Sequence, residues 1–173
     1  EISCSLVGSE MCIRDRIEEA NKFAEKNGME PIRISQINYS LAHSSVETFG
    51  DNTLVCMDTK EFRWYKKHDF PVMAFSPQAK GFFAKLAKGD AANNLPEGQY
   101  AGPANLARLA KVKQLSEQTG DTPAKITLGY LNSQPFFVSS VFAVTKLWQL
   151  DEDMEAQDLT YDPKTVAFLE NMI

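Results

Sequence analysis

Apolar and polar positions along the chain recur with two different periods, which predict its secondary structure. Apolar residues at helical spacing predict six helices, over residues 16–27, 58–69, 105–120, 122–134, 146–156 and 162–173. Short runs rich in β-branched and aromatic residues predict three strands, over 32–38, 71–75 and 136–144. The connections 39–52 and 76–102 are expected to be loops, and a connection as long as the second is usually functional.

Residues typical of helix ends support these boundaries. Thr122 and Asp162 are suited to cap the helices that follow them, and each precedes a proline, which is favoured in the first turn. Asp58 is a similar cap candidate. Gly28 and Gly120 stand where a helix commonly ends in a left-handed residue. The boundaries of these helices are therefore better supported than those of the strands.

The order of the elements indicates the fold class. Strands that alternate with helices are typical of parallel βαβ units, and strands this apolar are expected to be buried on both faces. Three strands cannot close a barrel, and the sequence contains neither the G-x-G-x-x-G nor the G-x-x-x-x-G-K-[ST] motif of nucleotide-binding α/β proteins. The sequence therefore predicts an α/β fold that is part of a (β/α)₈ barrel.

Composition narrows the range of functions. The chain has 173 residues, a net charge of −5 and 43% hydrophobic residues, which suits one globular unit. It has no basic stripe for a nucleic acid and no apolar run of the ~20 residues that a membrane helix needs. Its 3 cysteines fit neither a zinc site nor a disulfide framework, and its 2 histidines leave little for a metal site. A reducing, cytoplasmic location is expected, and oligomeric state is left open.

The N-terminal stretch has a different character from the rest. Residues 6–15, LVGSEMCIRD, have no clear period and resemble one reading frame of a transposase adapter used to prepare sequencing libraries. We therefore expect residues 1–15 to be a non-native segment that packs on nothing. Residues 16–173 are expected to be the C-terminal part of a barrel domain whose beginning is missing.

Four segments, in this order and spacing, carry a resemblance to a known family. ISQINYSL, VMAFSPQAKGFF, TPAKITLGYL and VFAVTKLWQLDED together resemble the C-terminal half of an aldo-keto reductase. The resemblance implies a (β/α)₈ barrel of which this chain holds about strands six to eight. It also implies an NADP(H)-dependent oxidoreductase that reduces aldehyde or ketone carbonyls by hydride transfer, with NADPH as cofactor, no metal and a small-molecule carbonyl as substrate.

The resemblance also implies how the chain holds the nicotinamide half of NADPH. Gln36 matches the residue whose amide bonds the nicotinamide carboxamide, and an amide has both a donor and an acceptor for this. Phe75 matches the aromatic residue on which the nicotinamide ring stacks. Ser76, Gln78 and Gly81 match the turn that meets the pyrophosphate, where a glycine allows close backbone approach.

The adenosine end of NADPH is expected in the last region, where the match is less regular. Lys146 is suited to the 2′-phosphate, but Gln149 stands where many relatives have arginine. Glu152 matches the family, whereas Asp153 replaces an asparagine that commonly bonds adenine. Dinucleotide binding is therefore better supported than a preference for NADPH over NADH.

The catalytic residues of the family are not matched by any stretch of the chain. Aldo-keto reductases use a tyrosine, a lysine, an aspartate and a histidine from their first four strands. Tyr39, His43 and Trp64 are candidates only for lining a substrate pocket. The chain alone is therefore expected to be inactive. Two alternatives remain: a non-catalytic NADPH-binding regulatory barrel, and an isomerase or aldolase barrel that binds a phosphorylated substrate.

Overall fold

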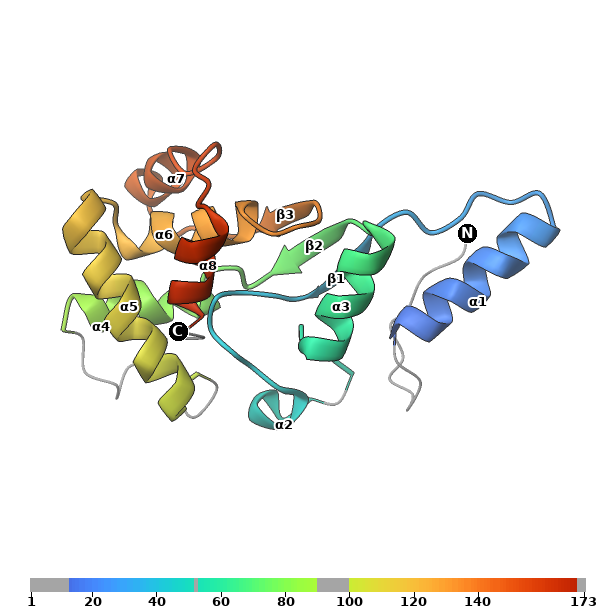
Figure 1. Ribbon diagram of the computed structural model, residues 1–173, viewed down its shortest axis with the longest axis horizontal. Coiled ribbons are helices and arrows are strands. Elements are labelled where there is room, and N and C mark those ends of the chain that lie inside the picture. Colours follow the sequence, from blue (N-terminus) through green and yellow to red (C-terminus); the bar gives the residue numbers. More distant parts are fainter. Residues whose placement is uncertain (1–12, 52, 90–99, 171–173) are drawn as a thin grey trace.

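Helices pack against one face of a three-stranded parallel sheet in the computed structural model, which describes residues 13–51, 53–89 and 100–170 (Figure 1). The strands lie in the order β1 (Ser35–Asn38), β2 (Val72–Phe75) and β3 (Val138–Val141), and both pairs are parallel. The helices are α1 (Ile13–Lys26), α2 (Val46–Phe49), α3 (Thr59–His68), a 3-10 turn η1 (Ala79–Gly81), α4 (Phe82–Ala87), α5 (Pro103–Thr119), α6 (Pro123–Asn132), α7 (Leu147–Met154) and α8 (Pro163–Leu169). This arrangement confirms the predicted α/β fold of a partial barrel.

The predicted caps begin the helices as expected. The Asp58 side chain accepts hydrogen bonds from the first backbone N–H groups of α3, and Asp162 does the same for α8. Thr122 caps α6 in the same way. Gly120 follows α5 with φ +80°, the left-handed conformation that favours glycine. None of the helices formed by the described residues is both long and apolar enough to cross a membrane.

One face of the sheet is covered by helices and carries the core. Ile37, Val72 and Ala74 are fully buried on this face. α3 lies against it, since Ser35 Oγ and Tyr65 Oη are 2.6 Å apart. Aromatic and aliphatic side chains of α3, α4, α5 and α6 complete the same cluster.

The other face of the sheet is largely uncovered. Side chains alternate between faces along a strand, and partners in register share a face. Gln36, Met73 and Ser139 are in register on this face, and Phe75 and Val141 follow two residues later. Each of the five is half-buried or exposed. In a complete (β/α)₈ barrel the helices lie outside, so this is the face that the barrel turns inward.

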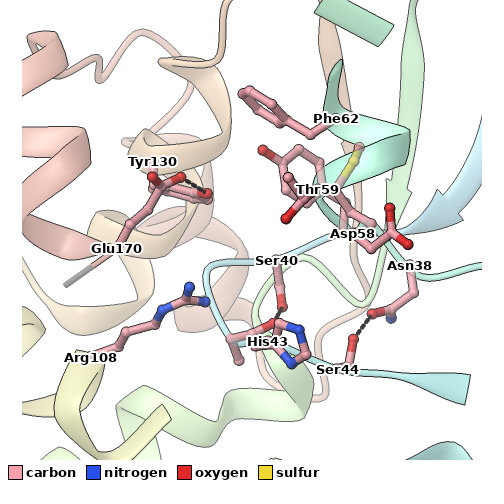
Figure 2. A pocket seen from close by; sticks show the side chains of 13 residues that line it. Asn38, Ser40, His43, Ser44, Asp58, Thr59, Phe62, Arg108, Tyr130 and Glu170 are labelled. Atoms are coloured by element: carbon pink, nitrogen blue, oxygen red, sulfur yellow. Dashed lines mark hydrogen bonds between the residues drawn. The ribbon is translucent and has the colours of Figure 1, made fainter. Parts of the chain in front are cut away.

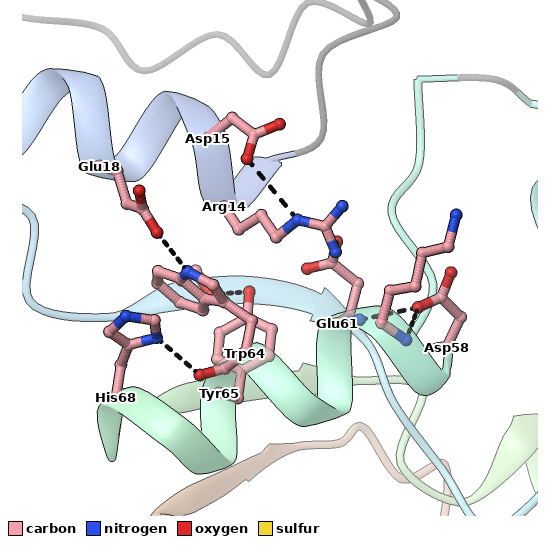
Figure 3. A network of polar contacts seen from close by, with 10 residues as sticks. Arg14, Asp15, Glu18, Asp58, Glu61, Trp64, Tyr65 and His68 are labelled. Atoms are coloured by element: carbon pink, nitrogen blue, oxygen red, sulfur yellow. Dashed lines mark hydrogen bonds and ion pairs between the residues drawn. The ribbon is translucent and has the colours of Figure 1, made fainter.

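Helix α1 packs against α3 at one end of the molecule (Figures 1 and 3). Trp64 Nε1 donates a hydrogen bond to Glu18 Oε1 at 2.6 Å, and Arg14 Nη1 lies 3.5 Å from Glu61 Oε1. Burial raises the pKa of the Glu61 carboxyl, and the Arg14 charge opposes that rise. The helix begins at Ile13, so residues 13–15 of the segment expected to pack on nothing belong to it. Residues 1–12 lie outside the described part.

Several predicted boundaries were wrong. The loop 76–102 contains η1 and α4, because burial of Phe82 and Phe83 stabilises a helical turn there. The loop 39–52 contains α2. The strands are shorter than predicted, and β3 is not buried on both faces, because it pairs only with β2 and its inward face is uncovered.

Candidate functional site

A pocket of about 260 Å³ lies where the segments that follow β2 and β3 meet the N-terminal end of α6. In parallel sheets, ligands bind at the carboxyl ends of the strands, so this is the expected place for a site. Five of the nine residues predicted to bind the cofactor line this pocket: Gln78, Gly81, Gln149, Glu152 and Asp153. These residues come from two segments more than 60 positions apart in the sequence, which the fold brings together.

Gln78 and Asp153 join the two walls of the pocket. Gln78 Nε2 donates a hydrogen bond to Asp153 Oδ1 at 2.6 Å across 75 positions of sequence. The Asp153 side chain is 5% exposed. Its burial raises the pKa of the carboxyl, and the hydrogen bond from Gln78 acts in the opposite direction. The turn after β2 is therefore held to α7 by a buried polar contact.

The turn after β2 has an unusual backbone. Ser76, Ala79 and Lys80 have φ of 52°, 51° and 55°, and Gly81 follows at 80°. Non-glycine residues in this region cost of order 1 kcal/mol each, and such residues cluster at ligand sites. The reversal places Gln78 towards α7. Two backbone N–H groups in this turn are already used within it, by Ala79 to the Ser76 carbonyl and by Gly81 to the Gln78 carbonyl.

Gln149 fixes the turn that precedes α7. Its Oε1 accepts three hydrogen bonds, from the backbone N–H and the hydroxyl of Thr145 at 3.0 and 3.1 Å and from the backbone N–H of Lys146 at 3.0 Å. Lys146 is the N-cap residue of α7 and its side chain is exposed. The only polar group that Gln149 has left is its amide NH₂, which can only donate.

Sequence reasoning missed two basic side chains that line the pocket. Lys85 and Lys88 belong to α4 and the residue after it, within the stretch taken to be a loop. Lys88 Nζ lies 5.3 Å from the centre of the Trp148 ring, over its face. Their spacing of three is compatible with one face of a helical turn, but no cap residue marks that turn in the sequence. With Glu152 and Asp153, the pocket carries two ammonium and two carboxylate groups.

The other four predicted residues do not line this pocket. Gln36 and Phe75 lie on the uncovered face of the sheet, where Gln36 pairs with Met73 and Phe75 ends β2. Ser76 is half-buried directly after β2, and Lys146 is exposed before α7. These positions run from the inward face of the sheet, past the end of β2, to the start of α7. Neither of the described histidines lines the pocket, and the described residues contain no cluster of His, Cys, Asp or Glu that could hold a metal.

Comparison with known proteins shows the family of the chain. The family model described as the Aldo/keto reductase family matches residues 14–173. A solved structure of a thermostable aldo-keto reductase, Tm1743, in complex with the inhibitor epalrestat superposes with a TM-score of 0.56 at 14% identity. The alignment covers 88% of this chain and 44% of that protein, so the chain spans less than half of that reductase. The superposition shows the fold alone, but the family model spans every described element from α1 to α8, and the chain belongs to the Aldo/keto reductase family.

Proposed function

We propose that this chain is the cofactor-binding part of an NADP(H)-dependent oxidoreductase that reduces aldehydes or ketones. The observation that carries the proposal is the pocket at the ends of β2 and β3, which combines side-chain amides with two lysines. Amide and ammonium groups donate hydrogen bonds to phosphate oxygens. The family match is compatible with the same chemistry, because aldo-keto reductases move a hydride between a nicotinamide and a carbonyl carbon.

Each part of the dinucleotide has proposed partners along this path. Gln36 and Phe75, on the inward face of the sheet, are the partners of the nicotinamide: one orients its amide and the other stacks on its ring. Ser76, Gln78 and Gly81, in the turn after β2, are the partners of the pyrophosphate. The proposed partners of the nicotinamide and of the pyrophosphate follow one another along the molecule in the same order as the two groups along the cofactor.

The adenosine end is proposed to meet α7 and the turn before it. Lys146, exposed at the N-terminus of α7, is the proposed partner of the 2′-phosphate, since both its charge and the helix dipole attract an anion there. The NH₂ of Gln149, which makes no hydrogen bond to the described residues, is a further donor for a phosphate oxygen. Glu152 and Asp153 suit the amino and hydroxyl donors of adenosine, because carboxylates only accept hydrogen bonds.

When bound, the nicotinamide would supply a hydride to the carbonyl carbon, and a tyrosine general acid would give the proton to the forming alkoxide. We propose that this tyrosine and its partners lie in a part of the protein that this chain does not contain. The chain spans 44% of the reductase to which it was compared, which supports this proposal. The 173-residue chain alone is then expected to show no turnover.

Two measurements on a full-length protein that contains this chain test the proposal. NADPH should quench the protein fluorescence saturably, and aldehydes should be reduced with loss of NADPH absorbance. Gln36→Ala should weaken binding of NADPH and NADH alike by roughly tenfold, because both carry the same nicotinamide. Gln114→Ala, an exposed glutamine on α5, is the matched control and should have no effect.

The outcomes separate the alternatives. NADPH binding without reduction of any of a broad set of aldehydes and ketones would favour a regulatory barrel. Saturable binding of sugar phosphates with no binding of NADPH would favour an isomerase or aldolase and would sink the proposal. An unchanged dissociation constant in Gln36→Ala would remove Gln36 from the nicotinamide site but leave the family assignment intact.

A further inference from the structure

A second pocket lies at the carboxyl end of β1 and shares no lining residue with the first. Its volume is about 320 Å³, within the range of small-molecule sites. The segment after β1 forms its floor, and α3, α5, α6 and the residue after α8 form its walls. Figure 2 shows Arg108 and the Tyr130–Glu170 pair on one side of this pocket, and Asp58 and Asn38 on the other.

Opposite charges face the pocket without pairing with each other. Arg108 Nη1 donates a hydrogen bond to the Leu41 carbonyl at 2.6 Å, and the other guanidinium N–H groups make no hydrogen bond within the described part of the chain. Glu170 Oε1 accepts from Tyr130 Oη at 2.7 Å, which leaves its second oxygen. Among the described residues, neither Arg108 nor Glu170 takes part in an ion pair. Each charge is therefore oriented by one contact and retains capacity for another.

A buried hydroxyl without a partner marks the same wall. Tyr39 is 4% exposed, and its Oη makes no hydrogen bond within the described part of the chain. Burial raises the pKa of this hydroxyl; contact with the Tyr130 hydroxyl acts in the opposite direction, the Glu170 carboxylate adds to the rise and the Arg108 guanidinium opposes it. Tyr39, Arg108 and Glu170 all line this pocket. A buried polar group without a hydrogen-bond partner destabilises the fold, and a polar ligand would offset that cost.

Hydrogen bonds from a buried side chain hold the floor of the pocket. Asn105 is 3% exposed, and its side chain bonds both the backbone N–H and the carbonyl of His43, at 2.7 and 2.8 Å. A further hydrogen bond joins Asn105 Nδ2 to the Tyr100 carbonyl at 2.9 Å. One buried amide therefore fixes the loop that carries the pocket floor. A fixed site loses less entropy when it binds a ligand than a mobile one.

From this arrangement we propose that the pocket binds a small zwitterion of the α-amino-acid type. Its carboxylate pairs with the Arg108 guanidinium, in the planar geometry that arginine favours for carboxylates. Its ammonium pairs with the free oxygen of Glu170, and the Tyr39 hydroxyl completes the site. Phe62, Met57 and Ala42 supply the apolar lining for a side chain. This site is independent of the proposed reductase function.

A ligand series on the unmodified 173-residue chain tests the proposal directly. L-leucine, 4-methylpentanoate and 3-methylbutylamine have the same apolar group and carry both charges, the carboxylate alone or the ammonium alone. Titrations followed by backbone amide chemical shifts should give L-leucine an affinity at least roughly tenfold above that of either analogue. Equal affinity for 4-methylpentanoate, or no saturable shift with L-leucine, overturns the proposal.

Two substitutions then assign each charge. Glu170→Gln keeps the shape and the oxygen that accepts from Tyr130. This variant should bind L-leucine roughly tenfold more weakly and should bind 4-methylpentanoate as the parent does. Arg108→Gln should lower the affinity for both carboxylate ligands. Lys113→Gln removes an exposed charge from the same helix as Arg108 and should change neither. Loss of L-leucine affinity in Lys113→Gln equal to that in Arg108→Gln would show a non-specific charge effect and refute the site.

Discussion

Gln149 offers a sharp test of how the turn before α7 is built. All three hydrogen bonds to its Oε1 come from Thr145 and Lys146, so one oxygen fixes two consecutive residues. Gln149→Leu keeps a side chain of similar size and removes the acceptor. Gln149→Glu keeps an acceptor oxygen and adds a negative charge near the N-terminus of α7, where the helix dipole favours it. The two variants therefore separate the acceptor from the rest of the side chain.

The magnitude follows from exposure. A protein hydrogen bond contributes a net ~0.5–1.5 kcal/mol, and a helix cap typically contributes ~1 kcal/mol. Thr145 and Lys146 are exposed, so water replaces part of what is lost and the three bonds do not add fully. We expect Gln149→Leu to lower the free energy of unfolding of this turn by about 1–2 kcal/mol, and Gln149→Glu to change it little.

Amide hydrogen exchange measures this effect at the two residues concerned. In Gln149→Leu the backbone amides of Thr145 and Lys146 should exchange roughly tenfold faster, while the amide of Ile37, in the buried strand β1, should not change. In a full-length protein, Gln149→Leu should weaken binding of NADH and NADPH together, since the turn is proposed to position the adenosine that both carry. Gln149→Glu should weaken NADPH selectively, because only NADPH has a 2′-phosphate to repel.

Two results would refute this reasoning. Unchanged exchange in Gln149→Leu would mean that the three hydrogen bonds do not hold the turn. Equal loss of protection in Gln149→Glu and Gln149→Leu would mean that the amide NH₂, and not the acceptor oxygen, is what matters. If Gln149→Glu leaves NADPH affinity intact while both exchange predictions hold, the turn is described correctly but Gln149 lies away from the phosphate.

Three further outcomes are expected. Burial raises the pKa of the Asp153 carboxyl in the folded state. The contribution of this carboxyl to the free energy of unfolding is therefore greatest below the unfolded pKa of ~3.9 and is lost as pH rises through the folded-state pKa. Urea unfolding should accordingly show Asp153→Asn gaining stability relative to the parent between pH 3 and pH 7, and a constant difference would contradict this. Lys146→Ala should weaken binding of NADPH but not of NADH, and the loss of affinity should be smaller at high salt, as titrations at two ionic strengths would show. An equal loss of affinity for NADH would mean that Lys146 does not contact the 2′-phosphate. Gly129→Ala should destabilise the fold by ~1–3 kcal/mol in thermal melts, because the added Cβ would lie 2.9 Å from Leu159 and Tyr161; an unchanged melting temperature would show that these side chains yield freely.

The sequence predicted the helices that carry their own end signals. Asp58, Thr122 and Asp162 cap helices because a short acceptor side chain satisfies nearby N–H groups, which is a local property. Helix α4 was missed because no cap marks it. The burial of Phe82 and Phe83 stabilises it, and burial depends on packing against distant residues. The sequence therefore predicted the capped helices, whose signals are local, but not α4, which depends on packing.

The candidate site shows the same division. The family resemblance indicated Gln78 and Asp153 as separate cofactor contacts, but nothing in the sequence indicated that they bond each other. Their contact spans 75 positions and depends on how the ends of β2 and β3 are placed. Gln149 was recognised as a cofactor-binding candidate that departs from the arginine of many relatives, and its role as an acceptor in its own turn could not be predicted from the sequence. Their roles towards a cofactor stay predictions.

The two halves of the proposed cofactor path differ in how complete they are within this chain. Among the described residues, the pocket that holds Gln78, Gln149 and Asp153 is lined by the segments after β2 and β3, by α4, by the start of α6 and by α7. Gln36 and Phe75, in contrast, lie on a sheet face whose opposite wall a closed barrel would provide from its other strands. Supplying those strands should therefore strengthen contacts to the nicotinamide far more than contacts to adenosine. Adenosine phosphates that lack the nicotinamide should then depend least on the rest of the barrel, and NADPH most.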